Sequence, residues 1–188
     1  MGHYTEKGCA VADETVNNAK KEFEQYMKKW VIHNNRFDLG IDVGCGTSRV
    51  DDMIVSVDRQ ADYKYAHAQL VWDCENLDLF ADGKLDFIFS SHCLEDFENI
   101  DRVFFNWWRK LRTNGLMLLL LPDMQGGRYP TVEQGGNPSH RTNTGKLFMV
   151  EMLKRLSERE GIKYEVLQQD TIPHNESSSI DFVIRKLS

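Results

Sequence analysis

Cysteine and long apolar segments are both scarce in this sequence. The four cysteines, Cys9, Cys45, Cys74 and Cys93, form no C-x-x-C pair, so a zinc site or a thioredoxin-like redox centre has no support, and we expect no metal. No apolar run reaches transmembrane length, and no signal peptide is recognisable. These absences predict a cytoplasmic protein with free thiols and no membrane partner.

Positive charge is also in short supply. The chain has 23 lysines and arginines against 29 aspartates and glutamates, which gives a net charge of −6 at pH 7. Because proteins that bind the phosphate backbone of nucleic acids need a basic surface, we do not expect nucleic acid to be the partner. A length of 188 residues suits one domain with a sizeable core.

The segment 39–48, Leu-Gly-Ile-Asp-Val-Gly-Cys-Gly-Thr-Ser, is typical of a buried strand that runs into a glycine turn. Gly44 and Gly46 lack a Cβ, so the backbone there can bend sharply and bring its N–H groups close to a ligand. Asp42 adds a carboxylate at the carboxyl end of the strand, the edge at which open α/β sheets bind ligands. The dinucleotide fingerprint is not met because Arg49 stands at its sixth position, and no Gly-Lys-Ser/Thr follows to make a Walker A loop.

Strand-like and helix-like segments alternate along the chain, which predicts a doubly wound α/β sheet. Strands are expected at residues 38–43, 54–58, 67–72, 85–92, 116–121, 164–167 and 180–184, the last two joined by a loop at 171–179. Helices are expected at 16–30, at 97–111 with Asn114-Gly115 as the stop signal, and from 144 to the glycine at 161.

The fourth expected strand and the segments that follow it carry the most specific pattern. They read Leu-Asp-Phe-Ile at 85–88, Ser-Ser-His-Cys-Leu-Glu at 90–95, Leu-Arg-Thr-Asn-Gly at 111–115 and an apolar strand ending in Pro-Asp at 122–123. Together with the glycine turn, this order resembles the motifs of the class I S-adenosylmethionine (SAM)-dependent methyltransferases, in their compact "type 11" branch. The resemblance covers roughly residues 38–123.

This resemblance implies a seven-stranded Rossmann-like sheet of order 3-2-1-4-5-7-6 with strand seven antiparallel. It also implies SAM as cofactor and S-adenosyl-L-homocysteine as product. An acid after strand two takes the ribose hydroxyls in such sheets, which points to Asp58, although an ordinary strand-end aspartate is the alternative. In the family an acid after strand three contacts the adenine amino group, which points to Asp73. The residues expected to bind the cofactor are Asp42, Gly44, Cys45, Gly46, Asp58, Arg59, Asp73, Cys74, Ser90, Ser91 and His92.

The whole chain, 1–188, is expected to form one methyltransferase domain. Residues 1–35 would be an arm and a helix, 36–123 the cofactor-binding core, and 144–188 a helix and a strand pair. The glycine-rich segment 124–143 is expected to be a long loop over the ligand edge of the sheet, like a lid.

The sequence departs from the family pattern in three places. Only sixteen residues separate Asp42 from Asp58, so the first crossover has room for about one helical turn, and the second is equally short. Ser48 replaces the third glycine of the turn. Asp96 stands where the family's Leu-Glu-His motif has its histidine, so no role of that histidine carries over.

Methyl transfer from a sulfonium depends mainly on alignment, and a base is needed only when the acceptor atom arrives protonated. The two candidate bases are His92, just past the fourth strand, and His140, in the glycine-rich loop; each is alternatively a substrate contact or a packed neighbour. Glu95 and Asp96 are expected to cap the following helix, with a contact to a cationic substrate as the alternative.

The sequence therefore predicts a SAM-dependent methyltransferase acting on a small-molecule or sugar-linked acceptor. The alternative is a SAM-binding module without catalysis, or the partner subunit of another enzyme, in line with the shortened crossovers. A nucleic-acid or protein methyltransferase is the third hypothesis, but the segment Ser-Ser-His-Cys at 90–93 is not the Asn/Asp-Pro-Pro-Tyr/Phe motif of adenine methyltransferases. No motif names the acceptor, the oligomeric state or the pathway.

Overall fold

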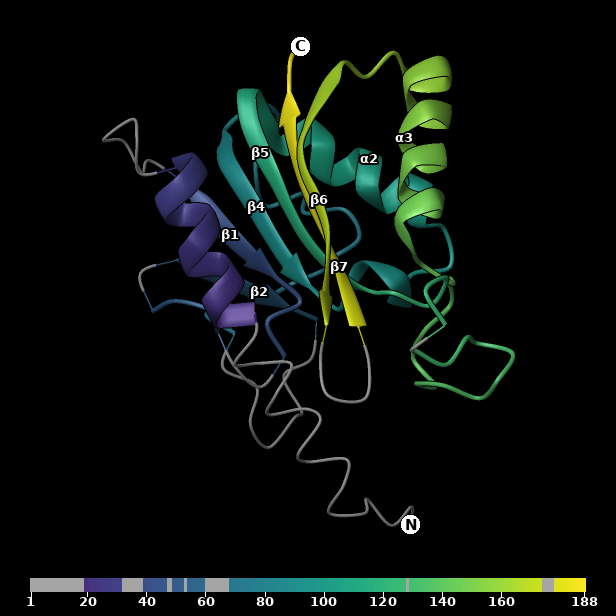
Figure 1. Ribbon diagram of the computed structural model, residues 1–188. Coiled ribbons are helices and arrows are strands. Elements are labelled where there is room, and N and C mark those ends of the chain that lie inside the picture. Colours follow the sequence, from purple (N-terminus) through teal and green to yellow (C-terminus); the bar gives the residue numbers. More distant parts are fainter. Residues whose placement is uncertain are drawn as a thin grey trace.

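The computed structural model describes residues 19–31, 39–46, 49–52, 54–59, 68–127, 129–173 and 178–188. Seven strands form one sheet of order β3-β2-β1-β4-β5-β7-β6 (Figure 1). Neighbours from β3 to β5 are parallel, and β7 is antiparallel to both β5 and β6. The sheet order and the antiparallel seventh strand predicted from the sequence are thus confirmed. The strands are β1 (Gly40–Val43), β2 (Val55–Asp58), β3 (Leu70–Val71), β4 (Leu85–Ser91), β5 (Leu111–Pro122), β6 (Tyr164–Pro173) and β7 (Ser178–Lys186).

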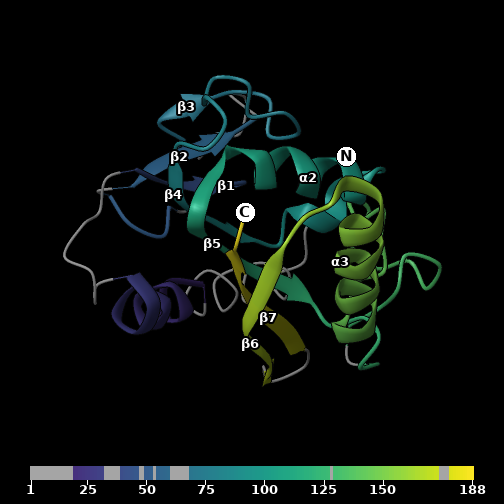
Figure 2. The same ribbon diagram turned by 90° about the horizontal axis from the view of Figure 1, so that it is seen from above.

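Helices cover both faces of the sheet, as Figure 2 shows from above. Helices α2 (Ile100–Lys110) and α3 (Lys146–Glu160) pack on one face. The helix at 19–26, which continues as the π-helical turn η1 (Met27–Val31), packs on the other. Alternation along β5 supplies both cores: Met117 and Leu119 face α2 and α3, whereas Leu116 and Leu118 face the N-terminal helix. The buried central strands are apolar on both sides for this reason.

The expected end of the second helix is wrong. Helix α2 ends at Lys110, and Leu111 already pairs with Leu85 in the sheet. The ladder then resumes at Leu116 opposite Phe87, so the residues between bulge outward. Asn114, with φ of 63°, turns the bulge rather than capping the helix.

The last two strands are longer than expected. Residues 171–173 and 178–179, expected in the connecting loop, continue the ladder between β6 and β7, with Thr171 opposite Ile180 and Pro173 opposite Ser178. The third strand is shorter than expected, with two residues only. The expected C-terminal glycine of α3 is confirmed, because Gly161 has φ of 71° and its N–H donates to the carbonyl of Ser157.

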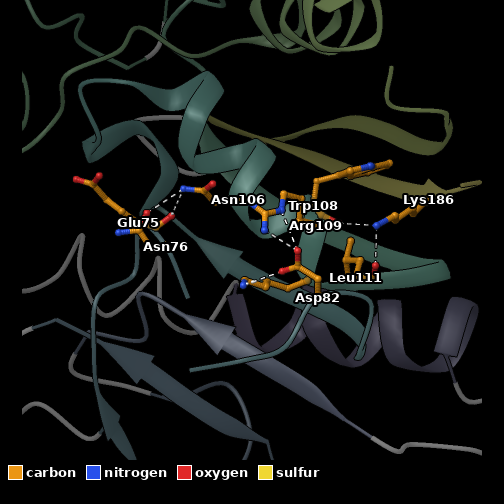
Figure 3. Close-up of polar contacts among 9 residues, drawn as sticks. Glu75, Asn76, Asp82, Asn106, Trp108, Arg109, Leu111 and Lys186 are labelled. Atoms are coloured by element: carbon orange, nitrogen blue, oxygen red, sulfur yellow. Dashed lines mark hydrogen bonds and ion pairs between the residues drawn. The ribbon is translucent and has the colours of Figure 1, made fainter. Parts of the chain in front are cut away.

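The segment between β3 and β4 is fastened to α2 by polar contacts (Figure 3). Asn106 donates to the Glu75 carbonyl at 3.2 Å and to the Asn76 side chain at 3.1 Å. Asp82 accepts from Arg109 and from Lys110, both in the last turn of α2. None of the described residues between β1 and β2 is helical, in agreement with the short crossover expected there. The α2 contacts therefore help to hold this end of the sheet.

Lys186, at the end of β7, contacts the end of helix α2. Its ammonium donates to the carbonyls of Trp108 at 3.0 Å and Leu111 at 2.8 Å, at the end of helix α2 (Figure 3). The carbonyls between them, of Arg109 and Lys110, accept from the N–H groups of Gly83 and Lys84. Burial lowers the pKa of Lys186. No helix within the described ranges is both long and apolar enough to cross a bilayer.

Gly40 gives the first prediction, because a Cβ there would lie 2.0 Å from the ring of Phe87, its partner in β4. Phe87 is buried, so its ring has little room to move. We expect Gly40→Ala to lower the free energy of unfolding by about 1–3 kcal/mol, as overpacking does. Urea denaturation measures it, and the cost should shrink in a Phe87→Leu background. An equal cost in both backgrounds would contradict this explanation.

Candidate functional site

The glycine turn after β1 lies directly against the chain that follows β4. Gly44 has φ of 74°, and a Cβ there would lie 2.3 Å from the sulfur of Cys93. Gly46 has φ of 53° with open space around it, and its N–H donates to the Asp58 carboxylate at 2.9 Å. Asp58 thus ties the turn to the end of β2. The Gly44 N–H donates to the Val57 carbonyl at 2.8 Å, so the N–H groups of both glycines bond within the fold. A role of this turn toward a cofactor stays a prediction.

Asp42 is buried beneath this turn. One of its carboxylate oxygens accepts from the Val50 N–H at 3.1 Å, which holds the segment after the turn. Burial raises the pKa of Asp42 to about 7, with a further contribution from Asp58. Cys45, between the two glycines, is also buried, and burial raises the pKa of its thiol to about 12. Both side chains therefore order the turn from below.

Three other expected cofactor residues have structural partners. The Asp73 carboxylate accepts from the Glu75 N–H at 2.8 Å and from the Asn76 side chain at 2.5 Å, so it caps its own turn. Cys74 is buried, and its carbonyl accepts from the Trp107 indole at 2.6 Å. The Ser90 hydroxyl donates to the Val43 carbonyl at 2.9 Å, which links β4 to β1. Their roles toward a cofactor stay predictions, as does that of Ser91.

The two candidate bases lie together around one carboxylate. Glu95 Oε1 is 3.7 Å from His92 Nδ1 and 3.5 Å from His140 Nε2. His140 Nε2 also lies 4.0 Å from Asp96 Oδ1. The Tyr129 ring stands beside both imidazoles, with centroid separations of 6.3 Å and 5.6 Å. The sequence did not single out Tyr129, and it offered no signal that Glu95 would lie between two histidines.

The capping role expected for Glu95 and Asp96 is wrong. Both lie in a short 3₁₀ turn, η3 (Leu94–Asp96), whereas α2 begins only at Ile100 and is capped by Asn99, which accepts from the Arg102 N–H at 3.0 Å. Glu95 instead points inward. Its carbonyl accepts from the N–H groups of Arg141 and Thr142, which pins the segment 124–143 to the end of β4.

This cluster is buried and poorly hydrogen-bonded. Glu95 is 0 % and His140 2 % exposed. Within the described residues, neither Glu95 oxygen has a hydrogen-bond partner, nor have Asp96 Oδ1 and His140 Nδ1. Burial raises the pKa of Glu95 well above its usual range, raises that of Asp96 and lowers that of His140. Buried polar atoms of this kind are rare in folded proteins and call for an explanation.

His92 is held in an unusual backbone conformation. Its φ of 50° lies in the left-handed region, which is uncommon for residues other than glycine. Its Nε2 lies 3.0 Å from the Ser179 hydroxyl of β7. Strain of this kind costs about 1–3 kcal/mol and clusters at functional sites. The conformation directs the imidazole across the end of β4 toward β7.

A pocket of about 480 Å³ opens beside the cluster. Arg59, Arg102 and Arg141 contribute guanidinium groups to its lining, and Asp96 and Ser139 line it from the cluster side. Arg59, expected to bind the cofactor, thus faces this pocket. The remaining lining residues are Glu75, Phe97, Glu98 and Asn99. The volume suits a small molecule.

Residues 41–119, somewhat under half of the chain, match the family model described as "Methyltransferase domain". No curated protein sequence matches the chain. The matched segment begins in β1 and ends in β5, so it contains the glycine turn, Asp58, His92 and Glu95.

Solved structures of similar fold extend the likeness to nearly the whole chain. A SAM-dependent methyltransferase from Archaeoglobus fulgidus is 15% identical with a TM-score of 0.58, covering 94% of this chain and 98% of that one. The 1,6-didemethyltoxoflavin-N1-methyltransferase of Burkholderia thailandensis, solved with its substrate and S-adenosylhomocysteine, is 11% identical with a TM-score of 0.67, covering 97% and 82%. A Haloferax volcanii methyltransferase described as putative, in complex with the Trm112 activator, is 13% identical with a TM-score of 0.61, covering 93% and 96%.

Asp42 gives a prediction about pH. A carboxyl whose pKa is higher in the folded than in the unfolded chain stabilises the fold fully only below the unfolded pKa, and that stability is lost as pH rises through about 7. We therefore expect the free energy of unfolding of Asp42→Asn to rise by about 2–4 kcal/mol relative to that of the wild type as the pH is raised from 5 to 8. Urea denaturation at both pH values measures it, with the exposed Glu151→Gln as control. A pH-independent difference would contradict the buried, uncharged carboxyl.

Proposed function

Because residues 41–119 match the family model described as "Methyltransferase domain" and the fold resembles that of SAM-dependent methyltransferases, we propose that this chain transfers a methyl group from SAM to a small-molecule acceptor. The observation that carries the proposal is the junction of the glycine turn with the His92–Glu95 segment. Gly44 and Cys93 are in contact, so a cradle for the donor and a cluster of proton-accepting side chains share one edge of the sheet.

The residues present fit SAM. The turn brings bare backbone to a strand end: a Cβ at Gly46 would have open space around it, and a side chain at Gly44 would meet Cys93. Asp58 lies at the end of β2 and binds the turn through the Gly46 N–H at 2.9 Å, so its carboxylate stands where a ribose hydroxyl would donate to it. When bound, SAM supplies a methyl group already activated on a sulfonium. Gly44, Gly46 and Asp58 would hold it, with Asp42 ordering the turn beneath.

The pocket beside the cluster suits the acceptor. It adjoins Asp96 and Ser139, and its lining holds three arginines and three acids, with Arg102 paired to Glu75. Arg59 and Arg141 are the guanidinium groups of this lining that would suit an anionic group of the acceptor, such as a carboxylate or a phosphate. A sugar-linked acceptor with such a group fits the same description.

Of the two histidines, His92 is the better placed to accept a proton from the acceptor. Its side chain is 16% exposed, whereas that of His140 is 2% exposed. The Ser179 hydroxyl, 3.0 Å from His92 Nε2, orients the imidazole, and Glu95 Oε1 lies 3.7 Å from its Nδ1. The chain aligns the acceptor and, where the acceptor atom carries a proton, His92 removes it.

Dependence on a partner subunit is the second candidate function. The Haloferax volcanii relative was solved with an activator protein. In this chain β3 forms an edge of the sheet, and Val71, Trp72 and Leu79 near it are each between 42% and 50% exposed. Exposed apolar side chains at a sheet edge favour an interaction surface. A folded chain that binds neither SAM nor S-adenosylhomocysteine would favour this candidate.

Asp58 gives the test of the cofactor site. We expect SAM and S-adenosylhomocysteine to bind the wild type, and Asp58→Asn to weaken both about ten- to a hundredfold, because hydrogen bonds to charged groups contribute about 1.5–3 kcal/mol. The amide still accepts from the Gly46 N–H, so the turn is kept. Calorimetric titration measures both ligands, with Glu151→Gln as control. Unchanged affinity in Asp58→Asn would remove Asp58 from the site.

His92 gives the test of the chemistry. We expect His92→Asn to lower kcat about 10²–10⁴-fold for an acceptor that loses a proton, since that is the usual contribution of a base. Asparagine tolerates the left-handed backbone of this position, so the fold should persist. SAM affinity measured by calorimetry should change little. Partial rescue of kcat by added imidazole would distinguish a base from a positioning residue, and an unchanged kcat would exclude His92 as the base.

A further inference from the structure

The proposed methyl transfer gives no role to the buried side chains of Glu95, Asp96 and His140, which cluster beside the pocket. Glu95, Asp96 and His140 each place one oxygen or nitrogen within 4.8 Å of the others. Glu95 is wholly buried, and neither of its oxygens accepts a hydrogen bond from the described residues. An isolated buried carboxylate is costly unless it is protonated, paired or bound to a metal.

The separations suit a metal ion. His140 Nε2 lies 3.5 Å from Glu95 Oε1 and 4.0 Å from Asp96 Oδ1. Ligands bound at about 2.1 Å lie about 3.0–4.2 Å apart, depending on the angle between the bonds. These two distances fit that range, and the Glu95 and Asp96 oxygens lie within 4.8 Å of each other, so an ion between the three ligands would require at most a small adjustment of the side chains.

The backbone holds the ligands in place. Glu95 and Asp96 lie in η3, directly after β4, and the N–H groups of Arg141 and Thr142 bond to the Glu95 carbonyl at 2.9 Å and 3.1 Å. His140 immediately precedes these anchors. The two halves of the cluster are thus fixed to each other by main-chain contacts, which do not depend on the side chains themselves.

We propose that Glu95, Asp96 and His140 bind a divalent cation such as Mn²⁺ or Zn²⁺. One imidazole nitrogen and two carboxylate oxygens form a donor set that both ions accept, and the two carboxylates balance the charge of the ion. The site goes beyond the methyl-transfer proposal and stands without it. It was not expected from the sequence, in which His140 lies far from the other two residues and no metal motif is present.

Asp96 also lines the pocket, so the cation would face it. Three protein ligands leave coordination positions for other oxygens. On the pocket side these positions would take oxygens of the acceptor, with Arg59 and Arg141 in the same lining to contact its negative charge. The acceptor class, which rests on the proposed function, is therefore an anionic molecule with neighbouring oxygen atoms able to chelate a metal.

The test uses the whole chain, freed of metal with a chelator and titrated with Mn²⁺ or Zn²⁺ in the absence of SAM. We expect a single saturable Mn²⁺ site by electron paramagnetic resonance, and the same site for Zn²⁺ by calorimetry. Glu95→Gln, Asp96→Asn and His140→Gln should each weaken binding about tenfold or more. Glu98→Gln removes an exposed carboxylate from the same pocket and should leave the affinity for both ions unchanged.

Folding is monitored separately, because Mn²⁺ should raise the thermal midpoint of the wild type and not that of Glu95→Gln. Glu95→Gln replaces a buried acid with a neutral group of the same shape, so we expect it to fold. No saturable binding of either ion, or binding that survives all three substitutions, would overturn the proposal. In that case Glu95 and His140 are a buried pair that shares a proton. SAM titration of the same sample tells this failure from a failure of the methyltransferase proposal.

Discussion

The close approach of the glycine turn to the end of β4 is the constraint on which this site depends. A side chain at position 44 would occupy the place of the Cys93 sulfur, so β1 and β4 can end side by side only with glycine there. The parallel pairing of these strands, with Val43 opposite Ser90, brings the two loops together. The Ser90 hydroxyl then bonds the Val43 carbonyl and fixes the register. His92 and Glu95 follow Ser90 within a few residues, so the same strand pairing places them near the glycine turn.

The described segments around this edge are turns fastened to other elements. Residues 72–84, between β3 and β4, are fastened to α2 through Asn106 and Asp82, and residues 140–142 to Glu95. Ser139 and Arg141 line the pocket and His140 belongs to the cluster, so the segment 124–143 supplies part of the wall of the candidate site. Its tip around 131–137 is largely exposed, whereas His140 is buried.

The sheet and the glycine turn could be predicted from the sequence because local patterns determine them. Glycines in a strand-end turn and an acid after β2 are short-range signals, and strand order follows from the family resemblance. Asn114-Gly115 misled because a helix C-cap and a strand bulge use the same residues for the same positive φ. Glu95 misled because an acid three residues after a strand and shortly before a helix is typical of a cap. Glu95 is buried beside His140, which lies in the long loop 124–143. The periodicity of the sequence does not indicate which part of the sheet such a loop contacts.

The contrast between two buried acids bears on function. Asp42 lies in β1 and Glu95 follows β4, and burial raises the pKa of each. Asp42 accepts the N–H of Val50 and holds a turn, so the fold supplies a partner for its carboxylate. Among the described residues no group donates a hydrogen bond to the Glu95 side chain, although the Glu95 carbonyl accepts two and anchors a loop. A fold that needed only the anchor could have an apolar side chain at this position, because the carbonyl belongs to the backbone. A bound cation therefore explains the Glu95 carboxylate, and the side chains of His140 and Asp96 lie beside it as the other proposed ligands.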